Sequence, residues 1–230
     1  MAGRDKSVIV SSHSITGLDL GRFHEISVST SDLDASLRFY ELMGFSRGSV
    51  DNVWPHPYAV VTLGGVTLGL HEYKFPSPSF TSVHDDVNAA LEAYREAGAV
   101  IAFAKTGSDC FNEFGLCDPA GHMITLLERA THPDDAWNPS STSPALGEFL
   151  AFSLPSAAPE ISAGFWQALG AEAWQGRPCW PATWLRAGGL VIAVHDEVQF
   201  DRPALVFHRH GVAEGTRLES PEGLAIVIVG

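Results

Sequence analysis

The sequence predicts an α+β protein built from four tandem βαβββ modules, the last one truncated, which form two curved mixed sheets. Residues 23–70 carry one such module: a short alternating segment, an amphipathic segment that ends at Gly44, and two or three further alternating apolar runs. The pattern recurs at a spacing of about 50 residues, which is typical of duplicated modules. The repeat is visible where TLGLHEY (67–73) is matched by VIAVHDE (191–197).

The first predicted strand, residues 23–30, sorts its side chains onto two faces because successive residues of a strand alternate. Ile26 and Val28 share the apolar face, which we expect to pack against the helices. Glu25, Ser27 and Ser29 share the opposite face. We expect this polar face to line the concave side of the sheet.

Helical spacing of apolar residues predicts one helix in each of the first three modules, each followed by a glycine stop. The first helix is expected to begin at Ser31 as its N-cap, with Asp32 and Asp34 in the first turn, where the helix dipole favours anions. The side chains expected to face the core are Leu33, Leu37 and Tyr40 in the first helix, Val87, Leu91 and Tyr94 in the second, and Ile161, Phe165 and Leu169 in the third.

The fourth module lacks a helix pattern, because residues 202–211 read as a strand and residues 220–230 return at once as a turn and a strand. A stretch dense in Pro, Ser, Asp and Thr, without any period, separates the second module from the third. The predicted organisation is therefore an N-terminal arm (1–21), a first two-module domain (22–130), a linker (131–146) and a second, degenerate two-module domain (147–230).

Composition restricts the partners of the protein. The net charge is −13, and the 14 basic residues form no cluster that could neutralise several phosphates, so nucleic acid is not an expected partner. No apolar run approaches the roughly 20 residues that span a bilayer. Three cysteines without CxxC spacing suit a reducing compartment better than a disulfide framework. We therefore expect a cytoplasmic protein that binds neither nucleic acid nor a membrane.

Three stretches resemble the vicinal oxygen chelate superfamily, which includes glyoxalase I, bleomycin-resistance proteins, fosfomycin-resistance enzymes and extradiol dioxygenases. They are HEISVSTSDLDASLRFYELMGF (24–45), GGVTLGLHE (64–72) and DPAGHMITLLE (118–128). The resemblance covers residues 22–130 well and 147–229 faintly. It implies that two modules pair into one sheet curved around a pocket, and that metal-dependent members take their ligands from the first and last strands of each module. It also implies a small-molecule ligand and a protein that is a monomer or a homodimer.

The positions that the resemblance assigns to metal ligands hold few residues able to bind a metal. In the first two modules they are Glu25, Gly69, Pro78 or Ser79, and Thr125; in the last two they are Phe149, Ala193, Pro203 and Val227. A dioxygenase needs two histidines and a carboxylate, and a glyoxalase needs three or four N/O ligands. We therefore expect no metal cofactor. The alternative is a divalent Fe, Mn, Ni or Zn ion at a displaced site formed by His24, Glu25, His71 and Glu72.

Glu25 and His71 are the expected catalytic residues. Glu25 in an apolar cavity would have a raised pKa suited to proton transfer; the structural alternative is a hydrogen-bonded glutamate near a strand end. His71 and its repeat counterpart His195 are each followed by an acid, which also fits a pair inherited by duplication that caps a strand end. The expected ligand-binding residues are Ser27, Trp54, Thr125 and Phe149.

Three functions remain open from the sequence. The first is binding of an apolar or planar small molecule in the N-terminal-half cavity, either by sequestration, as in bleomycin-resistance proteins, or with metal-independent acid/base chemistry of an isomerase, cyclase or lyase. The second is a metal-dependent glyoxalase- or dioxygenase-type enzyme with a displaced site. The third is a non-catalytic structural module whose pockets are filled by side chains.

Overall fold

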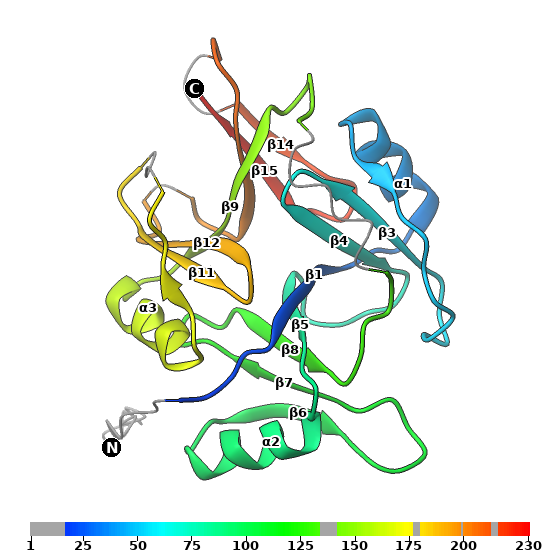
Figure 1. The fold of residues 1–230 in the computed structure, drawn as a ribbon. Helices are drawn as coiled ribbons and strands as arrows, with labels where there is room; N and C mark the ends of the chain where they lie inside the picture. Colours follow the sequence, from blue (N-terminus) through cyan, green and yellow to red (C-terminus); the bar gives the residue numbers. More distant parts are fainter. Residues whose placement is uncertain (1–16, 134–141, 177–179, 199, 213–215) are drawn as a thin grey trace, which may run out of the picture.

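The computed structural model describes residues 17–133, 142–176, 180–198, 200–212 and 216–230. It contains two mixed β-sheets and three helices (Figure 1). The first sheet has the order β2-β3-β4-β1-β5-β8-β7-β6 and the second β10-β11-β12-β9-β13-β15-β14. This is the α+β fold of paired βαβββ modules that the repeat predicted.

The strands of the first sheet are β1 (Arg22–Ser29), β2 (Ser46–Arg47), β3 (Tyr58–Leu63), β4 (Val66–His71), β5 (Ser79–Val83), β6 (Ile101–Lys105), β7 (Glu113–Cys117) and β8 (Met123–Leu127). Those of the second are β9 (Glu148–Pro155), β10 (Glu172–Ala173), β11 (Thr183–Ala187), β12 (Leu190–His195), β13 (Ala204–His208), β14 (Thr216–Glu219) and β15 (Ala225–Val229).

Each sheet joins two modules through its central strands. In the first sheet β1 is parallel to β4 and antiparallel to β5, and β5 is parallel to β8. In the second sheet β9 is parallel to β12 and antiparallel to β13, and β13 is parallel to β15. The first module therefore pairs with the second, and the third pairs with the fourth. No helix lies in the described part of the chain between β13 and β15, as the truncated pattern predicted.

The helices are α1 (Leu33–Leu42), α2 (Val87–Glu96) and α3 (Pro159–Ala168). The N-cap of α1 is Asp32 rather than the predicted Ser31, because the Asp32 side chain accepts the Ala35 N–H at 2.9 Å. Asp86 caps α2 in the same way. None of the helices in the described part of the chain is long and apolar enough to cross a membrane.

The stripe predicted for α3 is wrong at Ile161, whose side chain is 64% exposed. The buried residues of this helix are Ser162, Ala163 and Trp166. Trp166 is fully buried and packs edge-on against Phe80 of the first sheet at a ring-centroid distance of 5.2 Å. The bulkiest apolar side chain of the helix takes the core position, and this turns Ile161 toward solvent.

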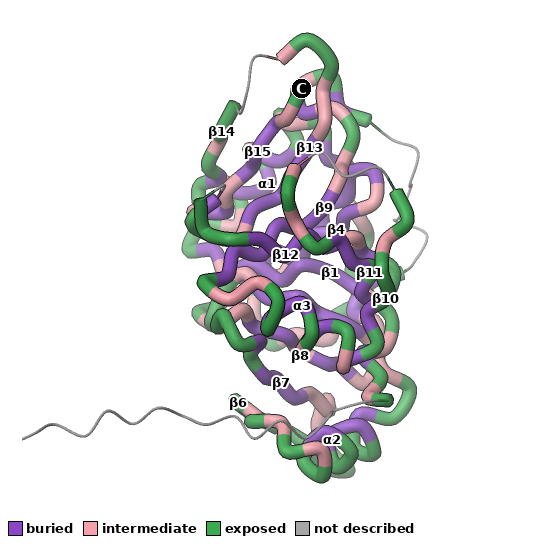
Figure 2. Tube along the Cα trace, turned by 90° about the vertical axis from the view of Figure 1, so that its left-hand side faces the viewer, coloured by how far each residue is buried: buried purple, intermediate pink, exposed green. Residues whose placement is uncertain are grey.

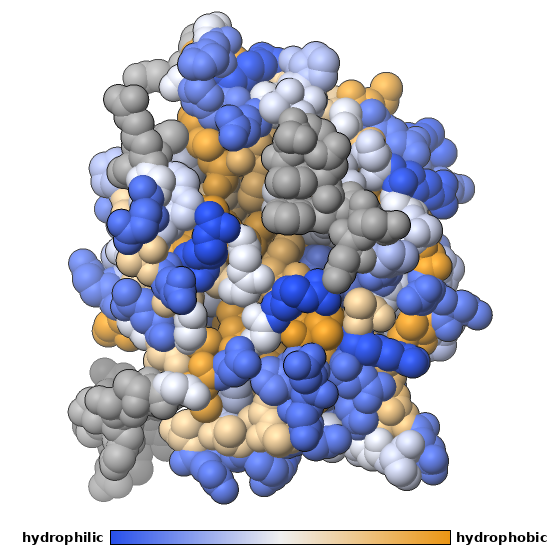
Figure 3. All heavy atoms as spheres, in the orientation of Figure 1, coloured by the Kyte–Doolittle hydropathy of each residue, from blue (hydrophilic) through white to orange (hydrophobic). Residues whose placement is uncertain are grey.

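One continuous core holds the two sheets and the helices together (Figure 2). Ile26 and Val28 of β1 belong to it, so their strand face packs inward as predicted. Contacts such as Phe45 with Phe207 join residues of the first sheet's modules to the second sheet. On the face shown in Figure 3, hydrophilic side chains surround a hollowed band in which apolar side chains are visible. The polar face of β1 is left to a cavity on the concave side of the first sheet.

Candidate functional site

The concave side of the first sheet encloses a cavity of about 330 Å³, the first cavity. Its floor is polar and its walls are aromatic, and side chains from both modules contribute to it. The lining residues are Ser27, Trp54, His56, His71, Tyr73, Lys74, Phe75, Pro76, Ser79, Thr81, Phe103, Glu113, Met123, Thr125 and Leu127.

Glu25 lies beneath this cavity and is fully buried. Its carboxylate accepts hydrogen bonds from the Ser27 hydroxyl at 2.6 Å and the Tyr58 hydroxyl at 2.5 Å. Nε2 of His71 lies 3.0 Å from the same carboxylate. A Cβ atom at Gly69 would collide with the carboxylate, so only glycine on β4 leaves room for Glu25 in this position. Glu25 is therefore held from three sides and does not face the ligand space itself.

The ionisation of Glu25 differs from the sequence-based expectation. Burial alone would raise its pKa, but the hydrogen bond from His71 and the electrostatic attraction of the His71, His24 and His132 rings outweigh burial and hold the pKa well below its usual range. The expectation of a raised pKa considered only an apolar cavity and is therefore wrong. Glu25 is an ionised hydrogen-bond acceptor.

The carboxylate fixes the proton positions of the two histidines that lead from it to the cavity. An ionised carboxylate only accepts, so Nε2 of His71 carries the proton that faces Glu25. A neutral His71 then accepts with Nδ1, which lies 2.9 Å from Nε2 of His56, so that nitrogen of His56 donates. Glu25, His71 and His56 thus form a relay that leaves the lone pair of His56 on Nδ1.

Aromatic side chains hold the His56 ring in place. It stacks on Trp54 at 5.7 Å and on Tyr73 at 5.0 Å, with interplanar angles of 24° and 17°. Burial, and then electrostatic repulsion between the protonated forms of His56 and His71, lower the pKa of His56. His56 is therefore placed at the cavity wall in a form suited to accept a proton.

The positions at which the family resemblance implies metal ligands do not fit a metal ion. In the first half these positions hold, apart from Glu25, only Gly69, Pro78 or Ser79, and Thr125, and the Ser79 and Thr125 hydroxyls lie 2.9 Å apart. The neighbouring hydroxyls of Ser27 and Thr81 lie 2.7 Å apart. In the second half the positions carry apolar side chains, namely Phe149, Ala193, Pro203 and Val227. Neutral hydroxyls paired in this way are poor ligands for the transition metals that imidazole and carboxylate groups select.

A second group, His24, Glu25 and His132, has the composition of a metal site and is buried, with candidate ligand atoms within 4.8 Å of one another. Its arrangement does not suit one. The rings of His24 and His132 stack at 3.9 Å and 11°, so their lone pairs lie in two nearly parallel planes and cannot both be directed at one ion. Nε2 of His24 also accepts the Thr131 N–H at 3.0 Å, whereas a metal-bound imidazole donates with its second nitrogen.

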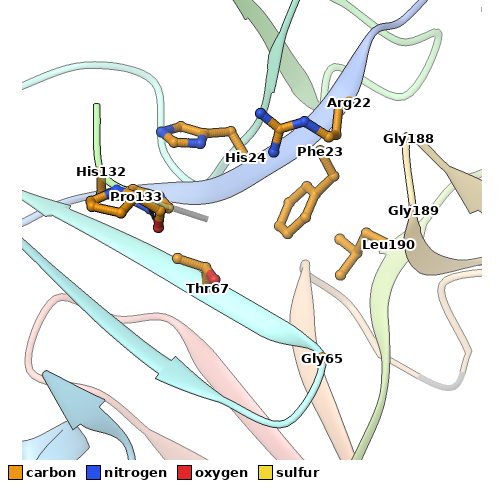
Figure 4. Close-up of a pocket in the computed structure, with 10 residues that line it drawn as sticks. All are labelled: Arg22, Phe23, His24, Gly65, Thr67, His132, Pro133, Gly188, Gly189 and Leu190. Carbon is orange, nitrogen blue, oxygen red and sulfur yellow. Dashed lines mark hydrogen bonds between the residues drawn. The ribbon is translucent and has the colours of Figure 1, made fainter. Parts of the chain in front are cut away.

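His24 and His132 line a second cavity of about 320 Å³ (Figure 4). It lies between the turns of the two sheets and is also lined by Arg22, Phe23, Gly65, Thr67, Pro133, Gly188, Gly189 and Leu190. Nε2 of His132 is buried without a hydrogen-bond partner, 3.7 Å from the Glu25 carboxylate. Glu25 thus contacts lining residues of both cavities, Ser27 and His71 of the first and His132 of the second.

The structure brings several of the predicted site residues together. Glu25 and His71 are in contact, and Ser27, Trp54 and Thr125 line the first cavity. Phe149 lies elsewhere: it is half-buried and packs edge-on against Phe207 at 5.5 Å. Glu72 is exposed at the end of β4 and is not part of the buried histidine group.

Three site residues were missed from the sequence. His56 lies in the segment before β3, where no period marks it, and His132 lies in the predicted linker, yet His132 is buried. Glu113, the first residue of β7, lines the first cavity. The one available signal was the placement of Trp54 beside His56 and Tyr58, a polar and aromatic run directly before an apolar strand.

Comparison with known proteins places the fold. No protein-family model matches the sequence, and no curated protein matches it. An extradiol ring-cleaving dioxygenase from B. fuscum superposes with a TM-score of 0.59 at 13% identity, over 94% of this chain and 73% of the dioxygenase. Homoprotocatechuate 2,3-dioxygenase from Arthrobacter globiformis superposes with a TM-score of 0.56 at 14% identity, over 94% of this chain and 81% of the dioxygenase.

A catechol 2,3-dioxygenase gives a TM-score of 0.55 at 13% identity, over 92% of this chain and 93% of the other. These likenesses confirm the fold implied by the resemblance to the vicinal oxygen chelate superfamily, of which extradiol dioxygenases are members. At such low identity they show the fold alone, and the chemistry has to be argued from the residues of this chain.

Proposed function

We propose that this chain, on the fold of the extradiol dioxygenases, binds an apolar or planar small molecule in the first cavity and performs metal-independent acid/base chemistry on it. The observation that carries the proposal is the Glu25–His71–His56 relay, which ends on the wall of an aromatic cavity. The resemblance of the fold adds only that proteins of this architecture have their pocket on the concave side of such a sheet.

The size and lining of the cavity indicate the kind of ligand. A volume of about 330 Å³ lies at the small end of the range for ligand pockets. Trp54, Phe75 and Phe103 supply aromatic surfaces, on which planar groups stack. Ser79, Thr81 and Thr125 supply hydroxyl groups that would orient a polar substituent. A planar ligand with one or two polar groups suits both surfaces.

The relay gives the cavity a general base. His56 would accept a proton from the ligand on Nδ1, and the resulting positive charge would be stabilised through His71 by the ionised Glu25. Because the pKa of His56 is lowered, its free-base form predominates at neutral pH. Simple sequestration would need the walls of the cavity but not this relay.

Binding is tested by thermal shift with a panel of planar aromatic compounds, since a ligand at 100 times its Kd adds about 2.7 kcal/mol of stability. Trp54→Ala should weaken the stabilisation. The matched control is Trp174→Ala, which removes a half-buried tryptophan from the second sheet, away from this cavity. Equal responses of both variants to every compound would contradict binding in the first cavity.

Chemistry is separated from sequestration with 4-nitrophenol, whose absorption distinguishes the phenol from the phenolate. In the wild type, bound probe should be less ionised than free probe at the same pH, because the phenol hydroxyl donates to the free-base nitrogen of His56 and the ionised Glu25 behind the relay disfavours a second negative charge. Glu25→Gln should remove this difference while leaving affinity within a few-fold. An unchanged spectrum on binding to the wild type would favour a pure binding protein.

The metal-dependent alternative has its own measurement, because two histidines and a carboxylate lie close together at His24, Glu25 and His132. Metal analysis of the protein purified without chelator decides it. Stoichiometric Fe, Mn, Ni or Zn, lost in His132→Ala, would replace the acid/base proposal with a metal-dependent one.

A further inference from the structure

Glu113 lies across the first cavity from His56. Glu113 opens β7 in the second module, and His56 directly precedes β3 in the first. In the strand order of the first sheet, β3 and β7 each lie two strands from the central β1–β5 pair, on opposite sides of it. Both residues line the same cavity, so the curved sheet holds them on opposing walls.

The carboxyl group of Glu113 has no structural task in the described part of the chain. It is half-buried and forms no side-chain hydrogen bond there and no ion pair within 4.0 Å. Lys105, its neighbour in register on β6, extends from an exposed edge strand. By contrast, Glu128 beside it accepts the Asn112 amide at 2.6 Å and is thereby satisfied.

The surroundings of the two residues favour opposite protonation states. Burial raises the pKa of Glu113, and the charges of Lys105 and His71 offset this only in part. Burial lowers the pKa of His56. Two titratable groups whose pKa values are pushed in opposite directions around one pocket are the usual signature of an acid and a base. The charged and titratable groups around Glu113 are Lys105 on β6, Glu128 after β8, Lys74 on the β4–β5 connection, and His71 and His56 across the cavity.

We propose that Glu113 is a second catalytic residue, the proton donor that faces the base His56, and that the ligand is a planar carbonyl compound able to interconvert between keto and enol forms. The inference rests on the proposed function of the first cavity. His56 takes a proton from the carbon next to the carbonyl, and the electron pair of the broken C–H bond remains on the ligand. Glu113 gives its proton to the carbonyl oxygen, so the step needs no oxidant or reductant.

The test uses 2-indanone, a planar ketone, as the probe. Its binding is first measured by thermal shift, and the exchange of its α-protons for deuterium in D₂O is then followed by proton NMR. Glu113→Gln should slow the protein-catalysed exchange by about 100-fold, the usual contribution of one general acid, with affinity within a few-fold. Glu128→Gln is the matched control and should leave the exchange rate unchanged.

The pH profile separates a catalytic role from a structural one. The exchange rate of the wild type should decline as the pH rises, because Glu113 then loses its proton. In Glu113→Gln this declining part of the pH profile should be absent. Glu113→Asp, which keeps a carboxyl group, should restore part of the rate and the limb. Variants are compared only after their melting temperatures show that they are folded.

Each outcome decides a separate claim. Binding without exchange in the wild type, or no binding of 2-indanone and the aromatic panel, would overturn the proposed function and this inference with it. Exchange that is as fast in Glu113→Gln as in the wild type would overturn the role of Glu113 and leave the His56 relay standing. Loss of exchange in Glu128→Gln as well would show a structural effect and would also overturn the assignment.

Discussion

The two halves of the molecule share the same arrangement of paired strands. Polar side chains lie on the concave face of the first sheet, whereas apolar side chains lie on that of the second. Pairing registers align β1 with β9, β4 with β12, β5 with β13 and β8 with β15. By these registers the polar positions Glu25, Ser27, Gly69, Thr81 and Thr125 of the first sheet correspond to Ala151, Ser153, Ala193, Val206 and Val227 of the second.

Large aromatic side chains occupy the second concave face. Trp184 packs on Trp180 at 4.4 Å and on Trp174 at 5.1 Å, while Phe200 packs on Trp180 at 5.8 Å. Small residues such as Ala151 and Ala193 lie beneath them in the same cluster. Aromatic side chains therefore fill the concave face of the second sheet as a hydrophobic core. The structural-module hypothesis, in which side chains fill the pockets, thus fits the second half alone.

The histidines show what the carboxylate contributes. His195 occupies the place of His71, but with Ala151 in place of Glu25 it binds the Ser153 hydroxyl at 2.6 Å instead. Burial lowers the pKa of His195, although the backbone carbonyl and the charge of Asp196 act in the opposite direction. Its ring nitrogens bind a hydroxyl and a backbone carbonyl, and neither binds a carboxylate as His71 does. A histidine therefore occurs at this position both beside an open cavity and beside a filled one. Glu25 and the open cavity, and not the histidine, distinguish the first half as a candidate site.

The largest expected effect distinguishes a filled hollow from an open one. Trp184→Ala should lower the free energy of unfolding by about 3–5 kcal/mol, because it leaves a cavity in a packed cluster. Trp54→Ala should cost about 1 kcal/mol, since part of that ring already faces the first cavity. Urea denaturation of both variants measures the difference, and equal losses would mean that the two hollows are packed alike.

Making the first half resemble the second is the next test. Glu25→Ala introduces the residue that Ala151 represents and should cost about 2–3 kcal/mol, because Ser27, Tyr58 and His71 lose a common buried acceptor. Ser153→Ala in the second half removes one neutral hydrogen bond and should cost about 1 kcal/mol. A smaller loss for Glu25→Ala than for Ser153→Ala, by urea denaturation, would contradict the role of Glu25.

Acid should affect the halves in two different pH ranges. The pKa of Glu25 is lowered on folding, so its stabilisation is complete above its ordinary value of about 4.5 and is lost as the pH falls below that value. The pKa of His195 is also lowered, so its stabilisation is lost as the pH falls through about 6.5.

Urea midpoints measured between pH 7 and pH 3 should therefore fall in two stages. Glu25→Gln should flatten the lower stage, and His195→Asn should reduce the upper one, to which His56 also contributes. If Glu25→Gln instead flattened the stage near pH 6.5, Glu25 would carry a raised pKa, as the sequence alone suggested.

The smallest effect concerns the helix of the second half. Ile161→Lys should change the free energy of unfolding by no more than about 0.5 kcal/mol, because its side chain is mostly exposed. Leu169→Ala, at a buried position predicted to share the same stripe, should cost about 2–5 kcal/mol. Similar costs for both, measured by thermal unfolding, would restore the stripe that the sequence predicted.

Local periodicity was enough to predict the sheets and half of the site. Glu25 and His71 meet because β1 and β4 are parallel neighbours, a consequence of the βαβββ order itself. β9 has the same register shift against β13 as β1 has against β5, so Phe149 corresponds to Phe23 and Ala151 corresponds to Glu25. The sequence prediction aligned the two strands two residues out of step, and Phe149 is therefore placed away from the cavity.

Other parts of the site depend on contacts distant in sequence. His132 reaches Glu25 across 107 residues of chain from a segment whose composition predicts a linker. The ionised state of Glu25 follows from three histidines that only the fold gathers around it. Charge on a buried group is set by such neighbours, so a face assignment from strand alternation could not provide it.

The most direct test of the account is the tautomeric state of the histidines, read from nitrogen NMR of the ¹⁵N-histidine-labelled protein without any ligand. The relay predicts that His71 carries its proton on Nε2, toward Glu25, and that His56 leaves Nδ1 without a proton, with both assignments lost in Glu25→Ala. A His71 protonated on Nδ1 and bare on Nε2 would place the proton on Glu25 instead. That result would contradict the ionised carboxylate from which the proposed chemistry is derived.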